Sequence, residues 1–300
     1  MGYTVSKTSP HKNQREPTMS ERNQLIQQLK AYRHKSVKRH ELVGGQSFTG
    51  VILLADESEE ETAIEAVEKW LSLYERDDFL KKLGAVEAGH KRHVFKDIPI
   101  IASGRAFIPK YYRHTTISHK AKALLYHQVG RRNFSTLCHL MKEGVRVTKP
   151  LALLSLYQRG MIHSEVLFTE KIPDGFINYK DLAPTLAVTD AKYRREFLSA
   201  LAAELISLHH ARAYTEDTDK NTFVLKSDDG YSFIFLDFDN VYPWRPPNFK
   251  RRAKNLSKFL NIFPDEDVQF MASEYLKLLG KESWGERFTK EIFLRLGRMK

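Results

Sequence analysis

Residues 208–225 read LHHARAYTEDTDKNTFVL, and residues 233–239 read FIFLDFD. The first stretch is typical of a helix end followed by an acidic loop and a short strand. The second is an aliphatic strand that ends in acid, and Asp228-Asp229-Gly230 between the two stretches is a turn signal. We therefore expect two short strands, Thr222–Lys226 and Tyr231–Asp237, with acidic residues before the first and at the end of the second.

Upstream of this unit, strand-like and helical patterns succeed each other. Lys110 lies in the strand-like run Arg105–Arg113, and a long helical stretch is expected from about Ser118 to Glu143, with Gly144 where a helix stop belongs. Pro173-Asp174-Gly175 is a turn signal that we interpret as the hinge between two lobes. The other expected elements are two strands and a helix, at 151–157, 165–172 and 190–212.

The first part of the chain contains another strand and helix. Phe48–Ala55 is an apolar run fit for a strand, and Ser58 with Glu61 forms a capping box before apolar residues at helical spacing. Strands with one long helix, followed mostly by helices, indicate an α+β fold of two lobes rather than a regular βαβ repeat. We expect a basic, disordered arm over 1–40, an N-terminal lobe over 41–172 and a C-terminal lobe over 173–300.

Composition narrows the class of protein. The 300 residues are 42% apolar, which is enough to bury a core, and no apolar run approaches the ~20 residues that span a bilayer. The single cysteine, Cys138, excludes an intramolecular disulfide and a cysteine-based zinc cage, so a reducing compartment is favoured. Nine basic and two acidic residues fall within 1–40, out of a net charge of +11. Two interpretations of this arm stay open: contact with an anionic membrane surface, or a solvated tail without a partner.

The order of the chemically competent residues indicates phosphoryl transfer from ATP. That reaction needs a strand lysine for the phosphates, a loop carboxylate that takes the acceptor's proton, and a carboxylate with a neutral oxygen ligand for Mg²⁺. Lys110, the acids of the loop after His210, and Asp237 occur in this order. The chain has no Walker A loop, no dinucleotide-binding glycine motif after a strand and no serine-nucleophile elbow.

These stretches resemble the protein-kinase-like fold and, within it, the Kdo/WaaP lipopolysaccharide kinase family, over roughly Gly104 to Gly280. The most specific local match is LMKEGVRVTKPLA at 140–152, and the loop at 208–225 has the length of the family's catalytic loop. The resemblance implies a bilobal protein-kinase-like fold. It also implies a cytoplasmic enzyme of Gram-negative bacteria, peripheral on the inner membrane, that uses ATP and Mg²⁺ to phosphorylate a heptose or Kdo sugar of a lipid-linked saccharide.

The resemblance assigns expected roles to the nucleotide-binding residues. Lys110 would bind the ATP phosphates, and Glu170 belongs to the strand that connects the lobes, whose backbone would meet the adenine. Asn133 falls at the helix position where the family has a glutamate that pairs with the strand lysine. Asparagine can hydrogen-bond an ammonium group but adds no charge, so Lys110 would be held less firmly.

The catalytic and metal-binding roles follow in the same way. Asp217 would be the general base, with Glu216 as the alternative if the loop register shifts by one residue. Asp237 would bind Mg²⁺ together with Asn221 or, in the ungapped register, Thr222. The departures from the family pattern leave a second hypothesis open, a pseudokinase of the same fold that binds nucleotide or a partner protein. A third, a nucleic-acid-binding protein, rests on the net charge alone.

Overall fold

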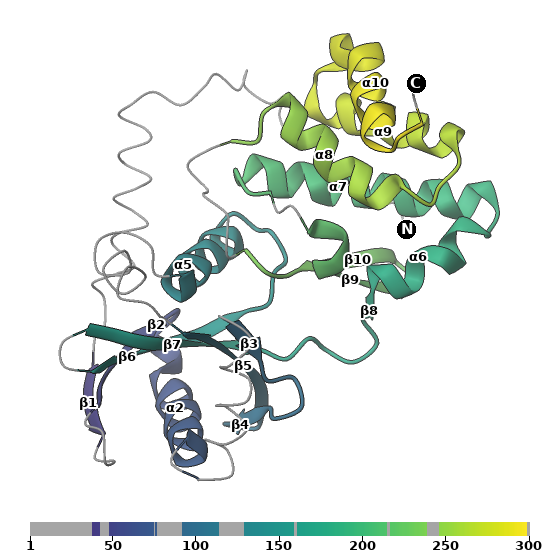
Figure 1. Ribbon diagram of the computed structural model, residues 1–300. Coiled ribbons are helices and arrows are strands. Elements are labelled where there is room, and N and C mark those ends of the chain that lie inside the picture. Colours follow the sequence, from purple (N-terminus) through teal and green to yellow (C-terminus); the bar gives the residue numbers. More distant parts are fainter. Residues whose placement is uncertain are drawn as a thin grey trace.

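The computed structural model describes residues 38–42, 48–74, 76, 92–113, 129–158, 161–214, 217–238 and 246–298. One lobe contains a large antiparallel sheet, and the other is mainly helical (Figure 1). In the described part of the chain, the large sheet has seven strands in the order β1-β2-β6-β7-β5-β3, and β4 also pairs with β5. These strands are β1 (Lys38–Leu42), β2 (Phe48–Leu54), β3 (Arg92–Val94), β4 (Ile100–Ala102), β5 (Arg105–Arg113), β6 (Pro150–Gln158) and β7 (Met161–Glu170).

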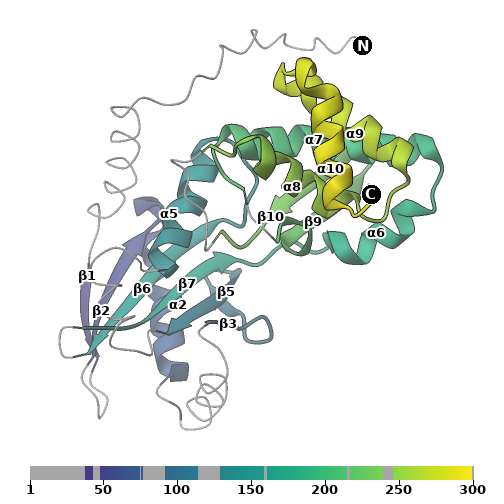
Figure 2. The same cartoon turned by 45° about the horizontal axis from the view of Figure 1, so that its top comes forward.

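Two helices cover opposite faces of this sheet, as Figure 1 and Figure 2 both show: α2 (Glu60–Tyr74), which follows the short η1 (Glu57–Glu59), and α5 (Val129–Lys142). Successive side chains of a strand point to opposite faces. Phe168 of β7 therefore joins the core under α2, where it meets Trp70 edge to face, while Leu167 joins the core under α5. The central strands β6 and β7 are therefore largely buried on both faces.

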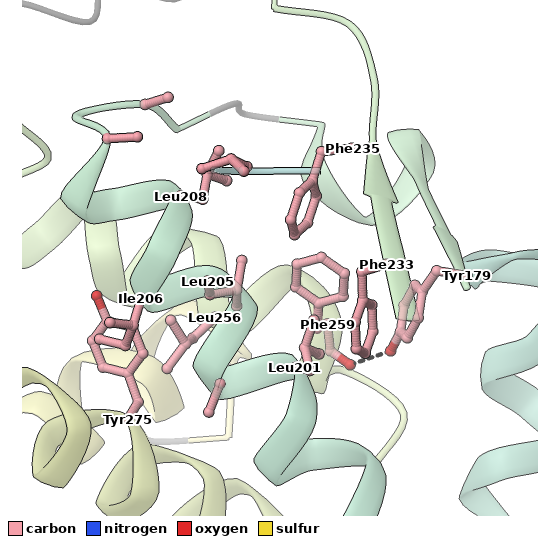
Figure 3. Close-up of a cluster of buried hydrophobic side chains, with 14 of the residues drawn as sticks. Tyr179, Leu201, Leu205, Ile206, Leu208, Phe233, Phe235, Leu256, Phe259 and Tyr275 are labelled. Atoms are coloured by element: carbon pink, nitrogen blue, oxygen red, sulfur yellow. Dashed lines mark hydrogen bonds between the residues drawn. The ribbon is translucent and has the colours of Figure 1, made fainter. Parts of the chain in front are cut away.

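The second lobe packs helices around a small sheet with the strand order β10-β9-β8. Its core joins Leu201 and Leu205 of the central helix to Phe233 and Phe259, and the hydroxyl of Tyr179 donates a hydrogen bond to the carbonyl of Phe259 (Figure 3). The elements are β8 (Ile177–Asn178), α6 (Tyr179–Ala187), α7 (Ala191–His210), η2 (Thr218–Asn221), β9 (Thr222–Ser227), β10 (Gly230–Phe235), α8 (Phe249–Leu260), α9 (Asp265–Leu279), η3 (Glu282–Trp284) and α10 (Gly285–Arg295).

A membrane-spanning helix, judged by length and hydropathy, does not occur among the described residues. The α+β architecture expected from the sequence is confirmed. The turn expected at 173–175 is present, with Gly175 at φ 93°, and it separates β7 from the helical lobe.

Several expected boundaries differ from the structure. The capping box at Ser58 is wrong, because the side chain of Asp56 accepts the Ser58 N–H and caps η1, and α2 begins only at Glu60. The expected strand 231–237 ends at Phe235, because Asp237 adopts a left-handed φ of 62° that a strand cannot continue. The helix expected from Ser118 is described only from Val129, and residues 114–128 lie outside the described ones.

The basic segment 1–40 lies almost entirely outside the described residues. Its last three residues belong to β1, which begins at Lys38 and pairs with β2, so the folded chain starts earlier than expected. Disorder and membrane contact of residues 1–37 stay predictions.

Candidate functional site

The two lobes meet at an ion pair. Lys110 of β5 points its ammonium group to the carboxylate of Asp237, two residues beyond β10, with 2.7 Å between Nζ and Oδ1. The lysine side chain is 11% exposed and the aspartate side chain 20%. A charge-assisted hydrogen bond is strong at such low exposure. Two residues that are 127 positions apart in sequence are thereby held together at the boundary between the lobes.

Two backbone hydrogen bonds hold the residues just before Asp237, one from each neighbouring segment. The N–H of Leu236 donates to the carbonyl of Asn221 at 2.7 Å, and the N–H of Phe235 donates to the carbonyl of Arg146 at 3.2 Å. Asp237 itself has φ 62°, a left-handed conformation that costs a non-glycine residue on the order of 1–3 kcal/mol. Strain of this kind persists where the surroundings impose it, and it aims the carboxylate at Lys110.

The structure distinguishes the two candidate neutral metal ligands. Thr222 is fully buried, and its hydroxyl donates to the carbonyl of Thr218 at 2.7 Å. Asn221 is partly exposed, and its carbonyl accepts the N–H of the residue before Asp237. A carboxylate and an amide oxygen on adjacent backbone segments fit Mg²⁺, which takes few protein ligands and keeps water or phosphate oxygens. In the described residues no cluster of three His, Cys, Asp or Glu forms a closed metal cage.

Asp217 stands at the start of η2, the turn that leads into Asn221. Its side chain is 56% exposed, and its Oδ1 lies 3.3 Å from Nζ of Lys220. Its carbonyl accepts the N–H groups of Lys220 and Asn221, both at 3.2 Å. The 3₁₀ turn η2 therefore joins the exposed carboxylate of Asp217 to the metal-ligand candidate Asn221 within five residues. The alternative base, Glu216, lies outside the described residues.

A buried chain of hydrogen bonds supports this turn from below. Arg252 donates to the hydroxyl of Tyr275 at 2.8 Å, which lies 2.6 Å from Nδ1 of His209. Nε2 of His209 lies 3.0 Å from Oδ1 of Asn255, whose Nδ2 donates to the hydroxyl of Thr218 at 2.8 Å. Three helices, α7, α8 and α9, contribute to the chain, and it ends on the residue next to Asp217.

The direction of these bonds follows from their chemistry. A guanidinium group only donates, so the hydroxyl of Tyr275 accepts from Arg252. Oδ1 of Asn255 only accepts, so the proton of the neutral His209 ring sits on Nε2, and Nδ1 accepts the hydrogen of the Tyr275 hydroxyl. Complete burial and then the nearby Arg252 charge lower the pKa of His209 to about 3, so the ring is neutral. Local sequence patterns did not indicate this role for His209, because Asn255 and Tyr275 come from helices far along the chain.

On the sheet side, α5 is held against β7 and β5. Both carboxylate oxygens of the fully buried Glu165 accept backbone N–H groups of the first helical turn, from Gly130 and Arg131, each at 3.1 Å. Nδ2 of Asn133, itself buried, donates to the hydroxyl of Tyr112 at 2.8 Å. The structure thus places Asn133 against the sheet beside β5. Glu165 was not expected from the sequence, although an acid inside the apolar run of β7 is a signal.

Glu170 closes β7 at the edge of the linker. Its N–H donates to the carbonyl of Lys149 at 2.8 Å, and its carboxylate lies 3.8 Å from Nε of Arg105. Glu59, which precedes α2, forms a two-bond pair with the same Arg105 and also binds Lys149. These hydrogen bonds, Arg105 first, lower the pKa of Glu59 to about 2 despite partial burial. The segment before α2 is therefore tied to the start of β5 and to the residue before β6.

Comparisons with known proteins agree with this architecture. A model of the lipopolysaccharide kinase (Kdo/WaaP) family matches residues 99–280, more than half of the chain. No curated protein matches. Among solved structures, WaaP in complex with acyl carrier protein is similar, with a TM-score of 0.51 and 14% sequence identity over 81% of this chain and 99% of that one. At that identity the likeness shows the fold, and the expected kinase-like fold is confirmed.

Proposed function

Because the chain belongs to the lipopolysaccharide kinase (Kdo/WaaP) family, we propose that it transfers the γ-phosphoryl group of ATP to a hydroxyl of a core sugar, a heptose or Kdo. The observation that carries the proposal is the inter-lobe pair of Lys110 and Asp237, with Asn221 and Asp217 on the adjoining turn. Phosphoryl transfer requires these groups: a cation that binds the phosphates, oxygen ligands for Mg²⁺, and an exposed carboxylate that can accept the proton of an incoming hydroxyl.

Each residue has a role in this proposal. The ammonium of Lys110 binds oxygens of the nucleotide phosphates, and the backbone after Glu170 meets the adenine. Asp237 and Asn221 would hold Mg²⁺, which would offset phosphate charge when bound. Asp217 accepts the proton of the sugar hydroxyl, so that the oxygen becomes a better nucleophile. Nζ of Lys220 lies 3.3 Å from Oδ1 of Asp217 in the unliganded protein.

A transfer assay tests the proposal directly. The full chain is incubated with ATP labelled in the γ-phosphate, Mg²⁺ and a lipid-linked core saccharide, and label in the lipid fraction is measured. Asp217→Asn should lower kcat by at least ~10²-fold while nucleotide binding is retained. Asp228→Asn, in the exposed turn between β9 and β10, is the matched control and should keep wild-type turnover. Loss of turnover in Glu216→Gln instead transfers the role of base to Glu216.

The second candidate is a pseudokinase of the same fold. One observation favours it: α5 contains no acidic residue, so Lys110 has no carboxylate partner from this helix. A shift of the melting temperature by ATP with Mg²⁺, without turnover on any sugar acceptor, would select this alternative, because a ligand that binds only the folded state raises stability.

Partners and location also remain proposals. We propose that the protein acts in the cytoplasm at the face of the inner membrane of a Gram-negative bacterium, where the basic residues of 1–37 meet anionic lipid. The similar WaaP structure contains acyl carrier protein, which makes that protein a candidate partner here. Co-sedimentation with anionic vesicles, with and without residues 1–37, tests the first point. Gel filtration with acyl carrier protein tests the second.

A further inference from the structure

The two groups proposed to bind phosphate and metal are bound to each other in the unliganded protein. Nζ of Lys110 and Oδ1 of Asp237 are 2.7 Å apart, in side chains that are 11% and 20% exposed. A phosphate needs the lysine, and a metal ion needs the aspartate. Either ligand, arriving alone, therefore competes with an existing charge-assisted hydrogen bond in a site that water only partly reaches.

We propose that this ion pair couples metal and nucleotide binding. Each ligand alone binds weakly, because it must break the pair; when both bind, the pair is replaced by one between Lys110 and phosphate and one between Asp237 and the metal ion. The inference rests on the function proposed above. ATP alone would bind Lys110 and leave the negatively charged carboxylate of Asp237 beside negatively charged phosphate oxygens. A metal ion alone would bind Asp237 and leave the ammonium group of Lys110 beside a second positive charge. Removing one partner from a pair of low exposure is costly, because the other charge stays uncompensated.

The backbone that leads into Asp237 is anchored, which opposes a displacement of its carboxylate away from Lys110. Its neighbours Leu236 and Phe235 are bonded through their N–H groups to Asn221 and Arg146, and its own φ is fixed at 62°. On the other side, the lysine rises from the middle of β5, where it is paired in register with Leu167 of β7. Both backbones are anchored, so the pair is broken by exchange of partners at the side chains. By linkage, the effect of metal on nucleotide affinity then equals the effect of nucleotide on metal affinity.

The test separates the two ligands. ATP binding to the full chain is measured by calorimetry in EDTA, and Mg²⁺ or Mn²⁺ binding is measured without nucleotide. In Asp237→Asn, ATP in EDTA should bind about tenfold more tightly than to wild type, since typical couplings are ~5–150-fold. Adenosine, which lacks phosphates, should bind both proteins within twofold. In Lys110→Met, the metal ion alone should bind several-fold more tightly than to wild type.

Matched controls come from an exposed ion pair. Nζ of Lys277 and Oε1 of Glu274 are 3.8 Å apart on the surface of α9, with 71% and 30% exposed side chains. Lys277→Met and Glu274→Gln remove the same charges and should leave both single-ligand affinities unchanged. If they shift the affinities as much as the site variants do, the effect is one of net charge and the inference is wrong.

The outcomes also separate this inference from the proposed function. If ATP with Mg²⁺ binds wild type but Asp237→Asn does not tighten binding of ATP in EDTA, the coupling is wrong and the function stands. If wild type binds no nucleotide even with Mg²⁺, the proposed function fails. Circular dichroism shows whether each variant is folded. If Asp237→Asn does not fold, tighter metal binding by Lys110→Met supports the inference and unchanged metal binding overturns it.

Discussion

Replacing Gly130 by alanine is expected to push α5 away from the sheet. A Cβ at this position would lie 3.0 Å from Cβ of Glu165, 3.1 Å from its Cδ and 3.0 Å from Cδ2 of Tyr112. Both neighbours are buried, and the carboxylate of Glu165 is already fixed by two backbone N–H groups of the helix. Overpacking costs ~1–3 kcal/mol. Alanine recovers up to ~1 kcal/mol of helix propensity, so the free energy of unfolding should fall by up to about 2 kcal/mol.

The measurement is the denaturant midpoint of the full chain, with Gly285→Ala as the control. Gly285 is the first residue of α10, and a Cβ there meets nothing within 4 Å. Its replacement should stabilise the protein by ~0.4–1 kcal/mol, because it restricts the unfolded chain. The two midpoints should move in opposite directions. A midpoint for Gly130→Ala at or above that of Gly285→Ala would refute the close approach of α5 to β7.

Three further predictions concern buried or paired groups. The pKa of Glu59 is about 2 in the folded protein, below its usual 4.5, so the ionised carboxylate stabilises the fold fully above pH 4.5 and this stabilisation is lost as the pH falls toward 2. The melting temperature of Glu59→Gln should therefore fall less than that of wild type between about pH 5 and pH 3. Asn255→Leu leaves His209 without its acceptor and should cost ~1–3 kcal/mol in a denaturant titration; Asn255→Asp keeps that acceptor but loses the N–H donor to Thr218, so it should cost less than Asn255→Leu and raise the pKa of His209 in an NMR titration. Burial raises the pKa of the Cys138 thiol to about 12, so iodoacetamide should label it only after denaturation; fast labelling of the native protein would contradict its burial.

The elements that sequence reasoning located well are those with a strong local pattern. The run Arg105–Arg113 is β5 with the same bounds, and the expected helix at 190–212 is α7 within one or two residues at each end. Two strands around Asp228-Asp229-Gly230 are β9 and β10. In each of them, apolar residues recur at the period of the element and turn residues mark its ends. The same local information supports the α+β class.

The supporting contacts of the site were beyond local reasoning. His209 meets Asn255 and Tyr275, which are 46 and 66 residues away, and Glu165 caps a helix 35 residues before it. No periodicity within a short window specifies such pairings, because they depend on how the helices cross. The expected capping box at Ser58 was wrong for a local reason. The side chain of Asp56 accepts the Ser58 N–H and caps a 3₁₀ turn that precedes the helix.

The absence of acid from α5 changes which part of the site can respond to ligands. A helix that supplied the carboxylate partner of Lys110 would weaken nucleotide binding by moving away. Here α5 runs from Val129 to Lys142 without Asp or Glu, so its displacement removes no negative charge from the lysine. The helix is also tied down, by Glu165 at its first turn and by His139, whose Nε2 lies 3.0 Å from the carbonyl of Ala211 in the other lobe. With the helix tied down and without an acidic residue, the ion pair between Lys110 and Asp237 is the contact at which the proposed ligands would compete. The proposed coupling therefore assigns control of nucleotide affinity to the metal ion that would compete for Asp237, rather than to a movement of α5.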